Sequence, residues 1–471
     1  MSQTRSRLAG ALLLLFAITG AREASCAATA ERITLPPYST HKLDNGATLL
    51  LMERHGLPLV SFVWLMKSGG SICDPDGHEG LASLTAQLLR KGTQTRSADE
   101  ISEALDFVGA SFDAGASHDY SSGAAEFVSK DLDLAVDLLA DLLRNPVFPA
   151  EELAKLIKQE VDGIAEAKEV PNQVIGRYFR RFLFGDHPYG RPVSGTERSL
   201  PSITREQVVT FHQAQYVPSQ LILAVAGDFN AEELRPKLSK ALSGWETRQA
   251  RVPALKNPLP LSRTRVLLVE KPDATQTFFR VGSIGLPRTS PDWVPLRVVN
   301  TLFGGRFTSM INTALRIDSG LTYGASSAFS SSPVAGEFFI GSFTKNETTS
   351  QALDMTLQVL RRLHSEGITS EQLQSAKSYI KGQFGPTLET NDQLAGTIAE
   401  LEFYGLGPDY INTLFDRVEA VSLADAKRLI KQYYPEDKVA VVLIGQSSVI
   451  QPAAEKLAGE VERKSITDPG F

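Results

Sequence analysis

The hydrophobic residues of the first half of the chain follow two different periods. The segments TLLLMER and LVSFVWLMK are rich in aliphatic and aromatic residues and flank a turn at residues 55–58, which predicts two strands. Residues 131–144 place leucine, alanine and valine on one face at helical spacing, which predicts a helix. Further helices are expected over residues 81–89, 98–108 and 149–169. Because strands and helices do not alternate strictly, we expect an antiparallel sheet covered by helices.

The segments that close the two halves look alike. QYVPSQLILAVAGDFN contains Tyr216 and Gly227, and QYYPEDKVAVVLIGQSS contains Tyr434 and Gly445, each 218 residues after its counterpart. Such a repeat is most simply explained by duplication of one folding unit. The predicted fold class is therefore α+β, with two homologous domains in a clam-shell arrangement, each a largely antiparallel sheet packed against helices.

A proline-rich stretch separates these halves. Pro253, Pro258 and Pro260 fall within residues 251–262, and closely spaced prolines favour an extended connector over a helix or a central strand. The expected domains are residues 32–250 and 263–460.

The first residues have the pattern of a secretory leader. Arg5 and Arg7 precede the apolar run 8–20, and small residues follow over 24–30, which predicts a signal peptide over residues 1–28. Lipidation of Cys26 is disfavoured because a glutamate stands three residues before it. No later apolar stretch is long enough to cross a membrane. We therefore expect an exported protein without a transmembrane segment in its mature part, most simply a periplasmic one.

Charge and cysteine content narrow the function classes. The 471-residue chain has 48 basic and 54 acidic side chains, a formal charge of −6, and no domain-sized basic block, so nucleic acid is not an expected partner. Once Cys26 leaves with the leader, Cys73 has no partner for a disulfide. A lone thiol of this kind is more often a small buried apolar residue than a nucleophile.

Three long segments resemble the pitrilysin/insulinase family of zinc peptidases, which includes the mitochondrial processing peptidase. They are LDNGATLLLMERHGLPLVSFVWLMKSGGS with the following GLASLTAQLLRKGT, then FGDHPYGRPVSGTERSLPSIT, and FGGRFTSMINTALRIDSGLTYGASS. They occur in the family's order and together span nearly the whole mature chain.

The family's inverted zinc motif, H-x-x-E-H, does not survive here. In that motif two histidines on adjacent helical turns bind zinc, and the glutamate activates the zinc-bound water. The corresponding positions are Ser83, Ala86 and Gln87, and the position of the further glutamate ligand is Gly163. The resemblance thus implies a non-catalytic type of subunit that binds no metal or other cofactor and does not cleave peptides alone.

No other residues replace these ligands in the sequence. The seven histidines form no H-x-x-H or H-E-x-x-H pattern. His78 and Glu79 are adjacent, and neighbouring helical residues point about 100° apart, so the two would not converge on one ion.

A second part of the family's site is retained. Active members hold the substrate with an arginine and a tyrosine from the second domain, and the segment LRIDSGLTY supplies Arg316 and Tyr323 at those positions. Their N–H and O–H groups could bind the scissile carbonyl and its developing oxyanion. The resemblance then implies a heterodimer in which a homologous partner with an intact H-x-x-E-H supplies zinc and both subunits act on a peptide substrate.

Other interpretations stay open at this stage. The chain could be a non-catalytic scaffold or a peptide-binding subunit of an envelope complex, in which Arg316 and Tyr323 are structural. An independent hydrolase using unrecognised residues is a more remote possibility. Residues 111–117 correspond to the family's substrate-accepting edge strand, although Asp113 and His118 suit an ordinary protected edge equally well. The loop with His187 and Arg191 is interpreted as structural.

Overall fold

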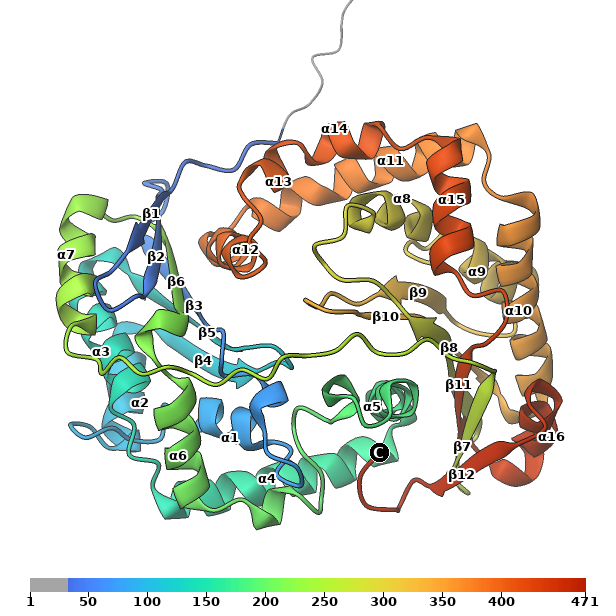
Figure 1. The fold of residues 1–471 in the computed structure, drawn as a ribbon, viewed down its shortest axis with the longest axis horizontal. Helices are drawn as coiled ribbons and strands as arrows, with labels where there is room; N and C mark the ends of the chain where they lie inside the picture. The colour runs from blue at the N-terminus through green and yellow to red at the C-terminus, as the bar shows by residue number, and fades with distance from the viewer. Residues whose placement is uncertain (1–32) are drawn as a thin grey trace, which may run out of the picture. The chain divides into compact units, whose positions relative to one another are not determined.

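The computed structural model describes residues 33–471, which form one compact unit. The predicted signal peptide, residues 1–28, lies outside the described residues. Within 33–471 the chain builds two six-stranded sheets, each accompanied by helices (Figure 1). The predicted α+β fold with two similar domains is confirmed. No described helix is both long and apolar enough to span a membrane.

The first sheet has the strand order β1-β2-β6-β3-β5-β4, and only β2 and β6 run parallel. Its central strand β6 reads LILAVAG and is buried along its whole length, as expected for a strand covered on both faces. The strands are β1 (Ser39–Lys42), β2 (Thr48–Glu53), β3 (Leu59–Met66), β4 (Ser111–Ala116), β5 (Ser121–Val128) and β6 (Leu221–Gly227).

The second sheet repeats this plan, with the order β12-β7-β11-β8-β10-β9. Five strands correspond one to one with the first sheet, and the central strand β11 is again fully buried. The sixth differs, because β12 runs parallel to β7 whereas β1 runs antiparallel to β2. The strands are β7 (Arg265–Glu270), β8 (Gln276–Ile284), β9 (Ala325–Phe329), β10 (Glu337–Lys345), β11 (Ala440–Gly445) and β12 (Val461–Ser465).

The four helices predicted in the first half are all present, and three more accompany them. The structure has α1 (Leu81–Leu88), α2 (Ala98–Val108), α3 (Leu132–Arg144), α4 (Ala150–Glu169), α5 (Pro171–Phe184), α6 (Arg205–Gln215) and α7 (Ala231–Leu242). Residues 251–262 contain no helix or strand.

The second half is richer in helices. They are α8 (Trp293–Phe303), α9 (Met310–Asn312), α10 (Thr349–Glu366), α11 (Ser370–Phe384), α12 (Asn391–Phe403), α13 (Asp409–Asn412), α14 (Leu414–Glu419), α15 (Leu423–Tyr433) and α16 (Ser447–Leu457).

Each half lends one helix to the sheet of the other. Helix α12, from the second half, packs on β3 and β6, while α5, from the first half, packs on β8 and β11 (Figure 1). The buried residues of α12 share a core with Leu50, Met52 and Ile222 of the first sheet. The two halves therefore share their cores, an arrangement that the sequence did not predict.

Candidate functional site

Helix α1 carries three of the four degenerate zinc positions, and its start is fixed by a turn. Gly80 precedes the helix with φ of 102°, a left-handed conformation that glycine adopts without strain. The side chain of Asp74 accepts the backbone N–H groups of Gly80 and Ala82 at 2.9 and 2.8 Å. These bonds satisfy donors at the helix start that have no partner within the helix.

Two of the degenerate positions lie against each other on α1. Gln87 Nε2 donates to Ser83 Oγ at 3.2 Å and to Glu160 Oε1, on α4, at 3.1 Å. Ala86 is fully buried. The side chains that stand at the metal positions are thus bound to one another, and Glu160 is the only carboxylate in this small network.

Gly163 lies on α4, one turn beyond Glu160. It is exposed, and a Cβ atom built there would meet no atom within 4 Å. The structure therefore has room for a side chain at this position but supplies none. Across residues 33–471, no group of three histidine, cysteine or acidic side chains is arranged to hold a metal ion. A serine, a glutamine and one carboxylate form a weak donor set for Zn²⁺.

The lone cysteine does not provide an alternative chemistry. Burial, together with nearby Asp74, raises the pKa of the Cys73 thiol to about 12. Its thiolate, the reactive form, is therefore scarce near neutral pH.

Ser83 opens onto a cavity of about 450 Å³ that contains four arginines and no acidic lining residue. Arg177 and Arg180 come from α5, Arg191 from the loop after it, and Arg280 from β8 of the second sheet. The helix exchange places these arginines together, because α5 packs on the strand that carries Arg280.

Only two of these four guanidinium groups are paired with a carboxylate. Arg180 bonds Glu337 at 2.9 Å and Arg191 bonds Asp76 at 2.5 Å. Arg280 stacks on the Phe339 ring at 4.1 Å, and no carboxylate of the described chain lies within ion-pair distance of it or of Arg177. One buried terminal nitrogen of Arg177 has no hydrogen-bond acceptor. The cavity is therefore electropositive.

The second-half residues Arg316 and Tyr323 lie in an exposed segment. Arg316 belongs to a π-helical turn, Thr313–Asp318, an irregularity often found at functional sites. Its guanidinium stacks on Phe307 at 4.7 Å. Tyr323 is 79% exposed. Neither side chain makes a hydrogen bond or ion pair with any residue of 33–471. The structure brings no other predicted site residue into contact with them.

The backbone under these two side chains is well held. The Leu315 carbonyl accepts the N–H groups of Leu321 and Thr322 at 2.9 and 3.3 Å. The Asn312 side chain accepts the Ala325 N–H at 3.1 Å, which ties the segment to β9. A fixed backbone with free side chains is an arrangement suited to contacting another molecule.

Two features that the sequence left open now have positions. Strand β4 is the last strand of its sheet, and Ala116 at its end lines the arginine cavity. His118 Nε2 lies 3.1 Å from the Arg191 carbonyl. His187 accepts the Tyr189 N–H at 3.1 Å, a structural role consistent with the interpretation of that loop.

The comparisons with known proteins agree with this architecture. Residues 57–197 match the model of the insulinase family of peptidases, M16, and residues 202–380 match the M16 peptidase inactive domain. Two folding units of this type, the first without its metal ligands, define a peptidase-like protein. The chain belongs to the M16 insulinase family.

The relatives include proteins named as zinc proteases. The chain is 25% identical over 405 residues to the uncharacterized zinc protease YmxG of Bacillus subtilis, covering 86% of this chain and 97% of that protein. It is 28% identical over 370 residues to an uncharacterized zinc protease of Mycobacterium leprae, covering 77% and 82%.

Solved structures share the fold. A peptidase M16 inactive domain from Pseudomonas fluorescens superposes with a TM-score of 0.82 at 24% identity, covering 87% of this chain and 98% of that one. A protease from Helicobacter pylori has the same TM-score at 19% identity, covering 87% and 100%.

Sequence reasoning missed two parts of this region. Glu160 stands one helical turn before Gly163, so helical spacing could have indicated that its carboxylate lies near the degenerate zinc positions. The arginine cavity could not be found this way, because Arg280 comes from the other half of the chain and nothing local pairs it with Arg177.

Proposed function

We propose that this chain is a catalytically incomplete subunit of an exported zinc peptidase. It places Arg316 and Tyr323 against a peptide that is bound at the zinc site of a homologous partner. The observation that carries the proposal is the exposed segment of Arg316 and Tyr323. Its backbone is fixed, while neither side chain makes a hydrogen bond or ion pair within residues 33–471.

The chemistry of the pair is that of carbonyl recognition. A guanidinium and a phenol O–H can both donate to the scissile carbonyl, and their bonds strengthen as negative charge develops on its oxygen. Phe307 supports the guanidinium from one side. Such donors act only beside a nucleophile, which the zinc-bound water of the partner would supply.

The same segment offers a surface for the partner. Phe307, Ile317 and Tyr323 are 60, 54 and 79% exposed, although they are large apolar or aromatic residues. Exposed side chains of this kind, gathered within a short stretch, are typical of interaction sites. A zinc-bearing partner is consistent with the zinc proteases among the relatives.

The test begins with the native complex. We would purify the tagged mature chain from its envelope fraction and assay the eluate for peptide cleavage that a zinc chelator abolishes. With the complex in hand, Arg316→Ala should lower kcat/KM by about 10²–10³ without changing assembly or zinc content. Tyr323→Phe removes only the phenol O–H and should act in the same direction. Arg361, an exposed arginine on α10, provides the matched control, Arg361→Ala, which should leave turnover unchanged.

The results separate this proposal from the scaffold alternative. Unchanged turnover in both Arg316→Ala and Tyr323→Phe would refute a role in catalysis. Loss of the partner from the purified complex, with normal turnover per assembled complex, would instead favour a scaffold that uses this surface for docking.

A further inference from the structure

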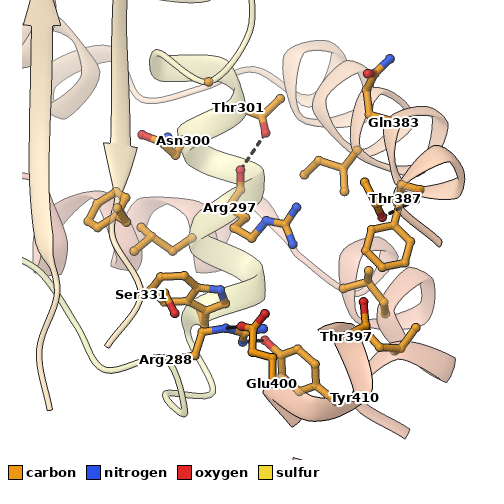
Figure 2. A pocket seen from close by; sticks show the side chains of 18 of the residues that line it. Arg288, Arg297, Asn300, Thr301, Ser331, Gln383, Thr387, Thr397, Glu400 and Tyr410 are labelled. Carbon is orange, nitrogen blue, oxygen red and sulfur yellow. Dashed lines mark hydrogen bonds and ion pairs between the residues drawn. The ribbon is translucent and has the colours of Figure 1, made fainter. Parts of the chain in front are cut away.

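The second half contains a cavity of about 590 Å³ that belongs to neither part of the site above. Helix α8 forms one side, and α11 to α14 form the other (Figure 2). Its walls are largely apolar and include Trp293, Leu296, Ile380, Phe384, Leu401 and Leu414. Its size lies within the ordinary range for small-ligand sites, roughly 300–1,000 Å³.

One cation projects into this apolar space. Figure 2 shows the Arg297 side chain extending from α8 into the gap that faces α11 and α12. Arg297 is exposed to solvent at this cavity, and its guanidinium makes no hydrogen bond or ion pair with any other residue of 33–471. Loss of hydration in the cavity lowers the pKa of Arg297, and Arg288 acts in the same direction, whereas Tyr410 and Glu400 act against it. An arginine stays protonated in a protein at neutral pH.

The other charged groups of the cavity are already paired. Arg288 bonds Glu400 at 3.4 Å and also donates to the Tyr410 hydroxyl, against whose ring it stacks at 4.7 Å. Arg297 is therefore the one charge of the lining without a partner in residues 33–471.

The hydroxyl of Thr301 and the amide of Asn300, which lie beside Arg297 on α8, are also engaged. Thr301 Oγ1 donates to the Arg297 carbonyl at 2.8 Å, as drawn in Figure 2. Asn300 is bonded to both the hydroxyl and the carbonyl of Ser327. Neither side chain accepts a hydrogen bond from the guanidinium, which is therefore free to donate to a ligand.

We propose that this cavity binds an apolar carboxylate, with the carboxylate on Arg297 and the apolar part against the surrounding side chains. An arginine binds a carboxylate through two parallel N–H···O bonds, and the apolar walls favour a hydrophobic body. Two sources have this chemistry: a free fatty acid, and the C-terminal residue of a peptide that ends in an apolar side chain. The site is independent of Arg316, Tyr323 and any zinc-bearing partner.

The experiment uses the purified chain and needs no peptidase activity. Dodecanoate is titrated by calorimetry and by tryptophan fluorescence, since Trp293 lies in the wall while Trp64 and Trp245 belong to the core of the first half. Saturable binding is expected, and dodecanol, which lacks the carboxylate, should bind about 10- to 100-fold more weakly. Arg297→Gln should weaken dodecanoate binding by a similar factor and leave dodecanol unaffected.

Two further variants guard against misfolding and non-specific effects. Arg297→Lys keeps the charge but cannot form both parallel hydrogen bonds, so it should lose less of the binding than Arg297→Gln does. Arg361→Gln, on the exposed face of α10, should not alter the binding. The source is decided with a peptide ending in leucine, compared as the free acid and as the C-terminal amide. Tighter binding of the free acid than of dodecanoate assigns the site to peptides, and the reverse order assigns it to fatty acids. Equal dodecanoate binding by Arg297→Gln and the unmodified chain, or no saturable binding of either carboxylate, would overturn the proposal.

Discussion

Replacing Ile398 by alanine tests whether the two halves are stable only together. Ile398 belongs to α12, in the second half, yet its fully buried side chain lies in the core of the first sheet with Leu50, Met52 and Ile222. The substitution removes three buried carbon atoms, or about 2.4 kcal/mol of transfer free energy at roughly 0.8 kcal/mol for each. With the cavity that remains, the free energy of unfolding should fall by about 3–4 kcal/mol.

The assay is unfolding in urea, monitored by hydrogen exchange and mass spectrometry. Peptides from β6 (Leu221–Gly227) and β11 (Ala440–Gly445) report on the central strands of the two sheets. Because α5 and α12 cross between the halves, we expect both peptides to lose protection together, although the substituted residue touches only the first sheet. Thr397→Ala, at the neighbouring and partly exposed position, is the control and should change stability by less than about 0.5 kcal/mol. If β6 loses protection while β11 keeps it, the halves unfold separately and the reasoning fails.

Two further predictions concern Gly163, at the position of the family's glutamate zinc ligand, and the buried residue His212. Gly163→Ala should raise the free energy of unfolding in urea by about 0.5–1 kcal/mol, because the position is an exposed helix interior with open space. Gly282→Ala should lower the free energy of unfolding, since its Cβ would stand 1.9 Å from the Phe338 carbonyl oxygen. A loss of stability in Gly163→Ala would contradict the prediction. Burial lowers the pKa of His212 to about 4, so the unfolded chain, with a histidine pKa of about 6.5, takes up the proton first as the pH falls. Stability should therefore decrease from pH 7 to pH 5 by on the order of 2 kcal/mol through this side chain. His212→Gln, which keeps a donor for the Leu143 carbonyl, should reduce that difference, and an unchanged pH dependence would be inconsistent with a buried neutral histidine.

The sequence predicted local structure well because its signals are local. The strands β6 and β11 are continuous apolar runs that end in glycine and recur at one spacing, so both the strands and the duplication could be recognised. The helix α3 follows from the helical spacing of its apolar residues, and the bounds of α4 follow from the prolines at 149 and 171. These elements need no knowledge of what lies opposite them.

The exchange of α5 and α12 had no such signal. An amphipathic pattern identifies the face of a helix that is buried, but it does not identify the sheet that buries it. Leu394 and Ile398 would look the same whether they faced their own sheet or the other one. The candidate site divides in the same way: Ser83, Ala86, Gln87 and Gly163 follow from motif positions, whereas the arginine cavity depends on contacts between distant parts of the chain.

The arginines bear directly on whether this region could hold a metal. A Zn²⁺ site of the H-x-x-E-H type gathers carboxylates and neutral imidazoles around a divalent cation. Here Ser83 shares its cavity with four guanidinium groups, and neither Arg177 nor Arg280 forms an ion pair with a carboxylate of residues 33–471. A cation placed beside them would be repelled, while an anion would be attracted. The substituted ligands and the positive surroundings therefore act in the same direction, and restoring the ligands at Ser83 and Gln87 alone would leave that repulsion in place.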